Sequence, residues 1–215
     1  MNTDDLIALL AQDTRPVRTG LVLRRLATFT AAGLCASLLL LLAWLPLRPD
    51  LQTAMHGASF WMKAVYTLAF AGVGGLALDP LSRPGGRVSM RVAGLFALAV
   101  GLMAGAAALD LWGADPDRRV ARWLGDSSEV CSLRIVALAV PLLIMTLTAT
   151  HSLAPTRLRP AGAAAGLLAG GLSAAVYALH CPEGAPAFIL CWYSLGMLAC
   201  AGIGALLGPV VLRWR

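Results

Sequence analysis

The residues best suited to chemistry in this sequence are two cysteines that lie far apart along the chain. Cys131 ends the stretch Ser-Glu-Val-Cys, and Cys181 stands in the stretch His-Cys-Pro-Glu, so both occur beside polar residues. Two thiols that meet in space can form a disulfide, exchange with other thiols or bind a thiophilic metal. His180 and Glu183 flank Cys181 and would add a nitrogen and an oxygen to such a metal site.

Two interpretations of the cysteine pair remain open from the residues alone. The first is a structural disulfide that ties two loops together on an oxidising face of a membrane. The second is a sensor in which Cys131 and Cys181, with His180 beside them, capture a metal or exchange with an oxidant. The spacing matches no standard structural zinc site, and the sequence has no Cys-x-x-C pair, which argues against a disulfide-generating oxidoreductase.

The other thiols and the basic residues in the apolar runs are explained by ordinary features of membrane helices. Cys35 and Cys200 fall inside such runs, where a thiol is usually a small buried hydrophobic group. Cys191 lies near the start of the last run and is ambiguous. Lys63 and Arg134 lie near the ends of runs, from which their long side chains can reach the membrane surface. No Asp, Glu or His stands in the middle of any run, and we therefore expect neither an enzyme nor an ion-coupled transporter.

The composition places these residues in a membrane protein. Hydrophobic residues make up 59% of the 215 residues and charged residues 13%, with a mean hydropathy of +0.76, against about 45–50% and about 25% in soluble domains. Six apolar runs each approach the roughly 20 residues that a bilayer requires. They cover residues 26–47, 58–78, 92–109, 133–150, 161–179 and 187–212. The sequence therefore predicts an all-α polytopic membrane protein, a bundle of six transmembrane helices with short loops.

The arginines predict how this bundle is oriented. Eleven of the 17 Lys and Arg residues fall before the first run, in the second and fourth loops, and after the last run. Because basic flanks stay in the cytoplasm, we expect both termini to be cytoplasmic and the Cys131 and Cys181 loops to face outward. Glycines four residues apart predict tight helix crossings in the third, fifth and sixth runs. These are Gly101 and Gly105, Gly162, Gly166 and Gly170, and Gly204 and Gly208.

The N-terminal segment, residues 1–24, reads as a separate binding element ahead of the transmembrane domain, residues 25–215. Asp4 and Asp5 would occupy the first turn of a short amphipathic helix. Its apolar residues are Leu6, Ile7, Leu9 and Leu10. A helix of two to three turns is unstable alone in water and needs a surface to fold on. The bilayer is one such surface, but acidic residues disfavour an anionic membrane, so we favour a groove on a protein partner.

Taken together, these features resemble a known family. The opening Thr3-Asp4-Asp5-Leu6-Ile7-Ala8-Leu9-Leu10, followed by Pro16-Val17-Arg18 and Arg24-Arg25 ahead of six spans, is similar to that of the NrsF-type negative regulators. These are bacterial inner-membrane anti-sigma factors that hold an extracytoplasmic-function (ECF) sigma factor at the membrane. The resemblance implies that residues 1–24 bind the sigma factor.

The resemblance also gives the cysteine pair a role. Cys131 and Cys181 match two outward-facing cysteines that the family uses to sense heavy metals or oxidative stress, and a change at them would release the sigma factor. No constitutive cofactor is expected, only a transient heavy-metal ion at Cys131 and Cys181. Cys35, Cys191 and Cys200 depart from a two-cysteine pattern. The cytoplasmic zinc-binding domain of other anti-sigma factors is also missing from the chain.

The expected function is therefore a membrane-bound anti-sigma factor whose partners are an ECF sigma factor and the lipid bilayer. A small membrane transporter or metal exporter that uses the outward thiols is the alternative. A structural assembly subunit with disulfide-linked loops is a third reading. Direct binding of nucleic acid is not expected, because the sequence has no long basic run and no basic patch interleaved with aromatic residues.

Overall fold

The computed structural model describes residues 2–12 and 20–214, and the described part of the chain is helical. The α-helices, in chain order, are α1 (Thr3–Gln12), α2 (Leu21–Trp44), α3 (Leu51–Ala54), α4 (Ala58–Leu81), α5 (Met90–Gly113), α6 (Pro116–Leu124), α7 (Ser128–His151), α8 (Leu158–Tyr177), α9 (Pro186–Phe188) and α10 (Ser194–Val211). A single π-helical turn, η1 (Ile189–Tyr193), joins α9 to α10.

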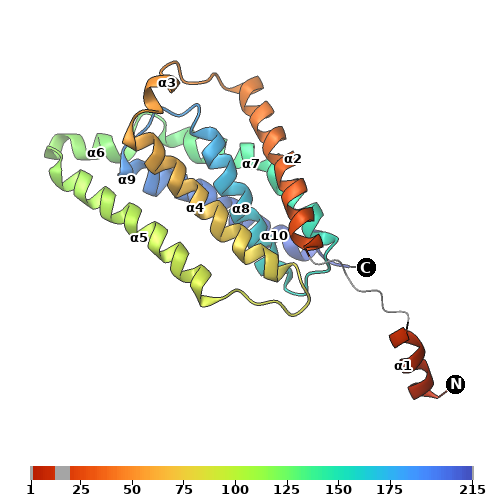
Figure 1. Ribbon diagram of the computed structural model, residues 1–215. Helices are drawn as coiled ribbons and strands as arrows, with labels where there is room; N and C mark the ends of the chain where they lie inside the picture. Colours follow the sequence, from red (N-terminus) through yellow and green to blue (C-terminus); the bar gives the residue numbers. More distant parts are fainter. Residues whose placement is uncertain (1, 13–19, 215) are drawn as a thin grey trace.

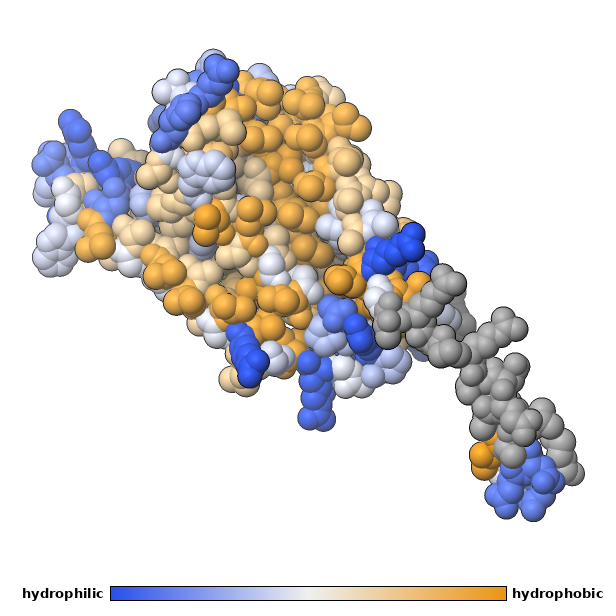
Figure 2. All heavy atoms as spheres, viewed as in Figure 1, coloured by the Kyte–Doolittle hydropathy of each residue, from blue (hydrophilic) through white to orange (hydrophobic). Residues whose placement is uncertain are grey.

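Six of these helical segments are long and apolar enough to cross a membrane, which confirms the fold predicted from the sequence. Hydrophobic side chains cover the visible flank of the bundle, and hydrophilic side chains gather towards its two ends (Figure 2). The third span, expected over residues 92–109, is longer than predicted, because α5 runs from Met90 to Gly113. The first span ends earlier, at Trp44, because Leu45 precedes Pro46 and takes the extended conformation that such a residue favours.

Helix α8 is the centre of the bundle and packs against α4, α7 and α10 (Figure 1). Helix α2 packs mainly on α7, and α5 lies at the edge beside α4. Small residues explain why α8 occupies the centre. Ala and Gly make up more than half of its 20 residues, so neighbouring backbones can approach it closely.

Glycine contacts fix α8 to α10 and to α4. A Cβ on Gly162 or Gly166 would collide with the backbone of Gly204 or Cys200 on α10, and one on Gly74 would collide with Leu168 on α8. The predicted crossing of the fifth and sixth spans is therefore confirmed. The prediction for the third span is wrong, because open space surrounds both Gly101 and Gly105 on α5.

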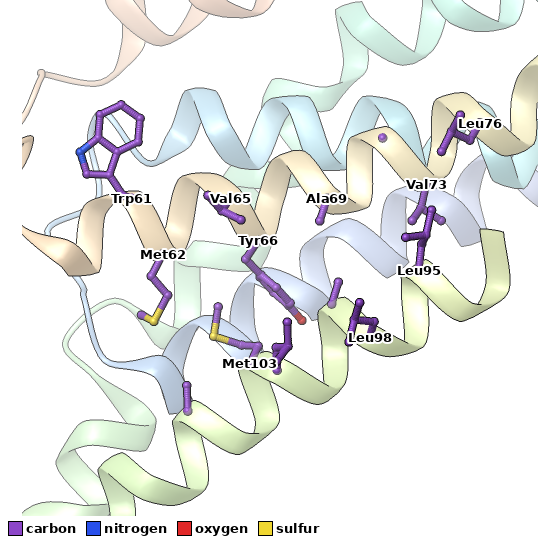
Figure 3. Close-up of a pocket in the computed structure, with 14 residues that line it drawn as sticks. Trp61, Met62, Val65, Tyr66, Ala69, Val73, Leu76, Leu95, Leu98 and Met103 are labelled. Carbon is purple, nitrogen blue, oxygen red and sulfur yellow. The ribbon is translucent and has the colours of Figure 1, made fainter. Parts of the chain in front are cut away.

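A lateral groove of about 620 Å³ separates α5 from α4. Its walls are apolar side chains, among them Val65, Leu76, Leu95 and Leu98, with Trp61 at one end (Figure 3). The aromatic rings of Phe70 and Phe96, with centroids 5.0 Å apart, pack α4 against α5. Since the groove lies between two spans and is lined by hydrocarbon, lipid chains are the solvent that suits it.

The two ends of the bundle differ. The C-terminus and the start of α2 lie at one end, here called the proximal end, and α1 lies beyond that end (Figure 1). Helices α3, α6 and α9 lie at the opposite end, here called the distal end (Figure 1). Helix α6 interrupts a polar stretch that the sequence analysis treated as loop, and Arg122 on it pairs with Asp110 at the end of α5.

Candidate functional site

Cys131 and Cys181 meet inside the distal end. Cys131 lies in the first turn of α7 and is 0% exposed, while Cys181 follows the end of α8 and is 1% exposed. Both are free thiols, and the Cys131 thiol donates a hydrogen bond to the Cys181 sulfur. The structure thus brings together two residues that the sequence separates widely, in a place closed to bulk water.

The chain after α8 forms a tight turn that carries Cys181. The backbone N–H groups of His180 and Cys181 both donate to the carbonyl of Tyr177, at 3.0 and 3.1 Å. Pro182 follows, and its missing N–H prevents the helix from continuing. Cys181 is therefore held at the end of the central helix, where its sulfur faces the start of α7.

Two cations hold the backbone of this turn. The carbonyl oxygen of Cys181 accepts hydrogen bonds from Lys63 Nζ on α4, at 3.0 Å, and from Arg48 Nη1, at 3.5 Å. The backbone N–H of Arg48 also donates to the carbonyl of Leu179, at 3.1 Å. Asp50 fixes the Arg48 guanidinium through a 2.7 Å ion pair, which lowers the pKa of Asp50 and raises that of Arg48.

Lys63 corrects one expectation from the sequence. Its side chain does not extend to the membrane surface, because it turns inward and is only 1% exposed. Besides the Cys181 carbonyl, its ammonium contacts the ring of Tyr193, 5.4 Å from the ring centroid. Tyr193 belongs to η1, and single π-turns of this kind are frequent at functional sites.

The electrostatic surroundings favour a thiolate at Cys181. The hydrogen bond from Cys131 has the largest effect, and the ammonium of Lys63 acts in the same direction. Together they lower the pKa of the Cys181 thiol well below its usual range, although burial opposes this shift. The buried hydroxyl of Tyr193 lies beside the Cys181 sulfur and lowers the pKa of this thiol further.

His180 adjoins Cys181 in sequence, but both of its ring nitrogens are engaged elsewhere. Nδ1 lies 2.6 Å from the carbonyl oxygen of Pro46 and donates to it, which leaves Nε2 to accept from Arg134 at 3.1 Å. Arg134 therefore binds His180, where the sequence analysis expected it to reach for the membrane surface. Glu183 also points elsewhere, since its Oε1 accepts the backbone N–H of Asp126 at 2.8 Å. Among the described residues, no three His, Cys, Asp or Glu side chains gather closely enough to hold a metal.

The other cysteines lie in different surroundings. Cys35 is exposed on the surface of α2, where the sequence analysis expected a buried thiol, and Cys200 is buried in the crossing of α8 and α10. Cys191 is half-buried, and its sulfur accepts a 3.0 Å hydrogen bond from Trp123 Nε1 on α6. Trp192 Nε1 in turn donates to the Trp123 carbonyl at 3.0 Å. This contact was not expected from the sequence, although Trp123, the aromatic residue of α6, gave a signal for it.

The residues expected to bind a partner lie on α1. The carboxylate of Asp5 accepts the backbone N–H of Asn2, at 3.3 Å, and with Asp4 it places negative charge on the first turn. Leu6 and Ile7 are 42% and 59% exposed. The side chains of Leu9 and Leu10 lie outside the described part of the structure. Helix α1 thus offers apolar side chains that the bundle does not cover (Figure 1).

Fold and site define a class of protein. The chain is a six-span helical membrane protein with a buried thiol pair at the distal end and an uncovered amphipathic helix at the proximal end. Comparison with known protein families identifies the family to which the chain belongs within this class. Residues 10–214 match the model of the NrsF family, described as negative regulator of sigma F, and the chain belongs to that family.

Two curated relatives extend over the whole chain. It is 43% identical over 216 residues to the anti-sigma-F factor NrsF of Caulobacter vibrioides (strain NA1000 / CB15N), covering all of both proteins. It is 42% identical over 215 residues to the probable anti-sigma-F factor NrsF of Azospira oryzae (strain ATCC BAA-33 / DSM 13638 / PS), again over both full lengths. No solved structure matches the chain.

Proposed function

We propose that this protein is an anti-sigma factor that holds an ECF sigma factor at the bacterial inner membrane through residues 1–24. Support comes from the full-length similarity to proteins named anti-sigma-F factors. The observation that carries the proposal is α1 itself, an amphipathic helix whose Leu6 and Ile7 remain exposed. An isolated helix of 10 residues gains its stability from a partner surface.

The charge of α1 indicates how the partner is oriented. Asp4 and Asp5 lie at the N-terminal end of the helix, next to the apolar residues. A groove with apolar walls and basic residues at one rim would complement this helix. In this proposal both termini lie in the cytoplasm, where the sigma factor is available, and the distal end faces outward.

Release of the sigma factor is assigned to the thiol pair. A heavy-metal ion or an oxidant that joins Cys131 to Cys181 bonds α7 to the end of α8, and the proposal takes this as the signal. Such an event changes sigma-factor binding only if the distance between the sulfurs differs in the binding and non-binding arrangements of the bundle. About 5.5 kcal/mol of differential affinity would switch nearly all copies.

The first experiment is co-purification of a candidate sigma factor with the detergent-solubilised protein. Leu6→Asp should reduce recovery of the sigma factor at least about tenfold, because a charge would enter the apolar contact. Ala8→Asp is the matched control, since it adds the same charge to the same helix and removes almost no apolar surface. Equal binding by both variants, or binding that survives deletion of residues 2–19, would refute a role for α1.

A reporter driven by the sigma factor tests the role of the thiols. Cys131→Ser or Cys181→Ser should abolish induction by a thiophilic metal and leave repression intact, while Cys35→Ser, at an exposed position on α2, is the control. Derepression without any metal would show instead that the cysteines hold the repressing state together. The transporter alternative predicts metal uptake into proteoliposomes that is lost in the same two variants.

A further inference from the structure

Helix α6 has an apolar face that the rest of the described chain leaves largely open. Val120, Trp123 and Leu124 lie on one side of this helix, and its arginines lie on the other side. No residue of α6 is buried, and Val120 is 61% exposed, Trp123 44% and Leu124 37%. An amphipathic helix of a soluble domain turns its apolar face to the protein core. The open face of α6 therefore requires a different apolar environment.

Contacts with the last span fix the direction of this face. Trp123 Nε1 donates to the Cys191 sulfur, and the Trp123 carbonyl accepts from Trp192 Nε1, both at 3.0 Å. Cys191 and Trp192 belong to η1, in the first turns of the span Pro186–Val211. Val120 lies one turn before Trp123 on the same side of α6. The apolar face is thus turned to the flank of the bundle, the side on which a surrounding bilayer lies.

The segment that follows α6 is held in place as well. The backbone N–H of Asp126 donates to Glu183 Oε1 at 2.8 Å. The hydroxyl of Ser127 lies 4.0 Å from the Cys181 sulfur. A rotation of α6 that buried its apolar face elsewhere would break these contacts together with those of Trp123. The open face is therefore a fixed feature of the distal end.

Tryptophans mark the boundary of the membrane at this end. Five of the six tryptophans of the chain belong to helix ends and turns that lie there (Figure 1). They are Trp44, Trp61, Trp112, Trp123 and Trp192. Trp112, in the last turn of α5, is 86% exposed, and Trp44 and Trp61 are about half exposed. Tryptophan collects where hydrocarbon meets lipid headgroups. Helix α6, between Trp112 and Trp123, therefore lies at that level.

The polar side of α6 suits lipid phosphate groups. Three arginines and three aspartates lie on α6 or next to it, namely Asp110, Asp115, Asp117, Arg118, Arg119 and Arg122. Arg118 is 77% exposed and lies 4.0 Å from Asp115, so its guanidinium remains available to a phosphate oxygen. Because the six charges cancel, the phosphates of zwitterionic lipids are sufficient partners, and a net negative membrane surface is not required.

We propose that α6 is an interfacial helix that binds the lipid surface at the distal end. Val120 and Leu124 lie against acyl chains, and Arg118 lies at the level of the phosphate groups. The occupant of the open face is thus the bilayer itself. In this position the bilayer holds the segment from α6 to Ser127, which contacts the turn of Cys181, at a fixed depth.

The test uses the full-length protein reconstituted in phosphatidylcholine bilayers. Cys35→Ser and Cys191→Ser remove the two cysteines that are not buried, and the serine at 191 keeps an acceptor for Trp123. A nitroxide spin label is placed on Val120→Cys or, as the matched control, on Arg118→Cys, on the opposite side of the same helix. Power saturation compares collisions with oxygen, which concentrates in hydrocarbon, and with a water-soluble nickel chelate. The oxygen-to-nickel ratio for Val120→Cys should exceed that for Arg118→Cys at least about threefold, since only the first label enters the acyl region.

Two results would overturn the proposal. Equal ratios at the two positions would show that α6 stands in water. Few collisions with either reagent at Val120→Cys would show that protein covers the face, and dipolar broadening between labels would identify that protein as a second copy. When phosphatidylglycerol replaces part of the lipid, the ratio should stay within about twofold of its first value; a contrast that requires this anionic lipid would overturn the balanced-charge argument. No sigma factor is present, so the outcome is independent of the proposed anti-sigma function.

Discussion

Gly166→Ala is the sharpest test of how the bundle positions the thiol pair, because Gly166 lies on α8, the helix that ends next to Cys181. The added Cβ would lie 2.9 Å from the Cα of Ala201 on α10 and closer still to the carbonyl oxygen of Cys200. Carbon atoms in contact prefer about 3.5–4.0 Å. Because the contact with the carbonyl oxygen is the closer one, the two helices would have to separate by roughly 1 Å along their glycine contacts.

The cost of that separation can be estimated. Overpacking of a well-packed core costs about 1–3 kcal/mol, and replacement of a helical Gly by Ala returns about 1 kcal/mol of helix propensity. The control is Gly101→Ala on α5, where nothing lies within 4 Å of the new Cβ, so only the propensity gain applies. We expect Gly166→Ala to be less stable than Gly101→Ala by about 1–3 kcal/mol.

Unfolding by sodium dodecyl sulfate in mixed micelles, followed by far-ultraviolet circular dichroism, measures this difference. Two variants with the same chemical change and the same helix propensity differ in this assay only through their contacts. Equal stability of the two variants, or a more stable Gly166→Ala, would show that α8 and α10 do not pack through their glycines. The model of the distal end as a site fixed by α8 would then fail.

Two further predictions concern the ends of the bundle. Trp123→Phe removes the N–H that donates to Cys191, so alkylation of Cys191 by N-ethylmaleimide should accelerate about two- to tenfold, the equivalent of one lost hydrogen bond; an unchanged rate would show that the contact does not protect the thiol. In a cysteine-free background and right-side-out vesicles, a membrane-impermeant maleimide should label Asp117→Cys, and it should label Thr3→Cys only after the vesicles are opened. The reverse pattern would invert the proposed orientation.

The spans were predictable from the sequence because their physical cause is local. Each backbone segment in hydrocarbon must satisfy its own hydrogen bonds, so about 20 apolar residues in a row indicate a helix wherever they occur. The sequence of α6 also contains local features that indicate a helix. Pro116 stands at its start after Asp115, and Val120, Trp123 and Leu124 follow with helical spacing.

The direction of Lys63 was not predictable in this way. One turn inside a span, a lysine can reach either the surface or a buried acceptor, and the choice depends on whether another element presents one. Here that acceptor is the Cys181 carbonyl, more than 100 positions away in sequence. The same reasoning applies to Gly101 and Gly105, whose spacing permits a helix crossing without supplying the partner helix.

In the proposed mechanism, the packing also limits how an event at the thiol pair would reach the N-terminal segment. Helix α2, which continues from that segment, packs mainly on α7. The hydroxyl of Ser37 on α2 donates to the carbonyl of Leu138 on α7 at 2.9 Å, and Gly33 brings the two backbones close beside Leu142. Since Cys131 lies in the first turn of α7, a bond between the sulfurs would act directly on the helix against which α2 packs. Helix α7 also packs on α8 and α10, so in the proposed mechanism a change in sulfur separation has to move α7 and α2 against these two helices, which glycine contacts hold together.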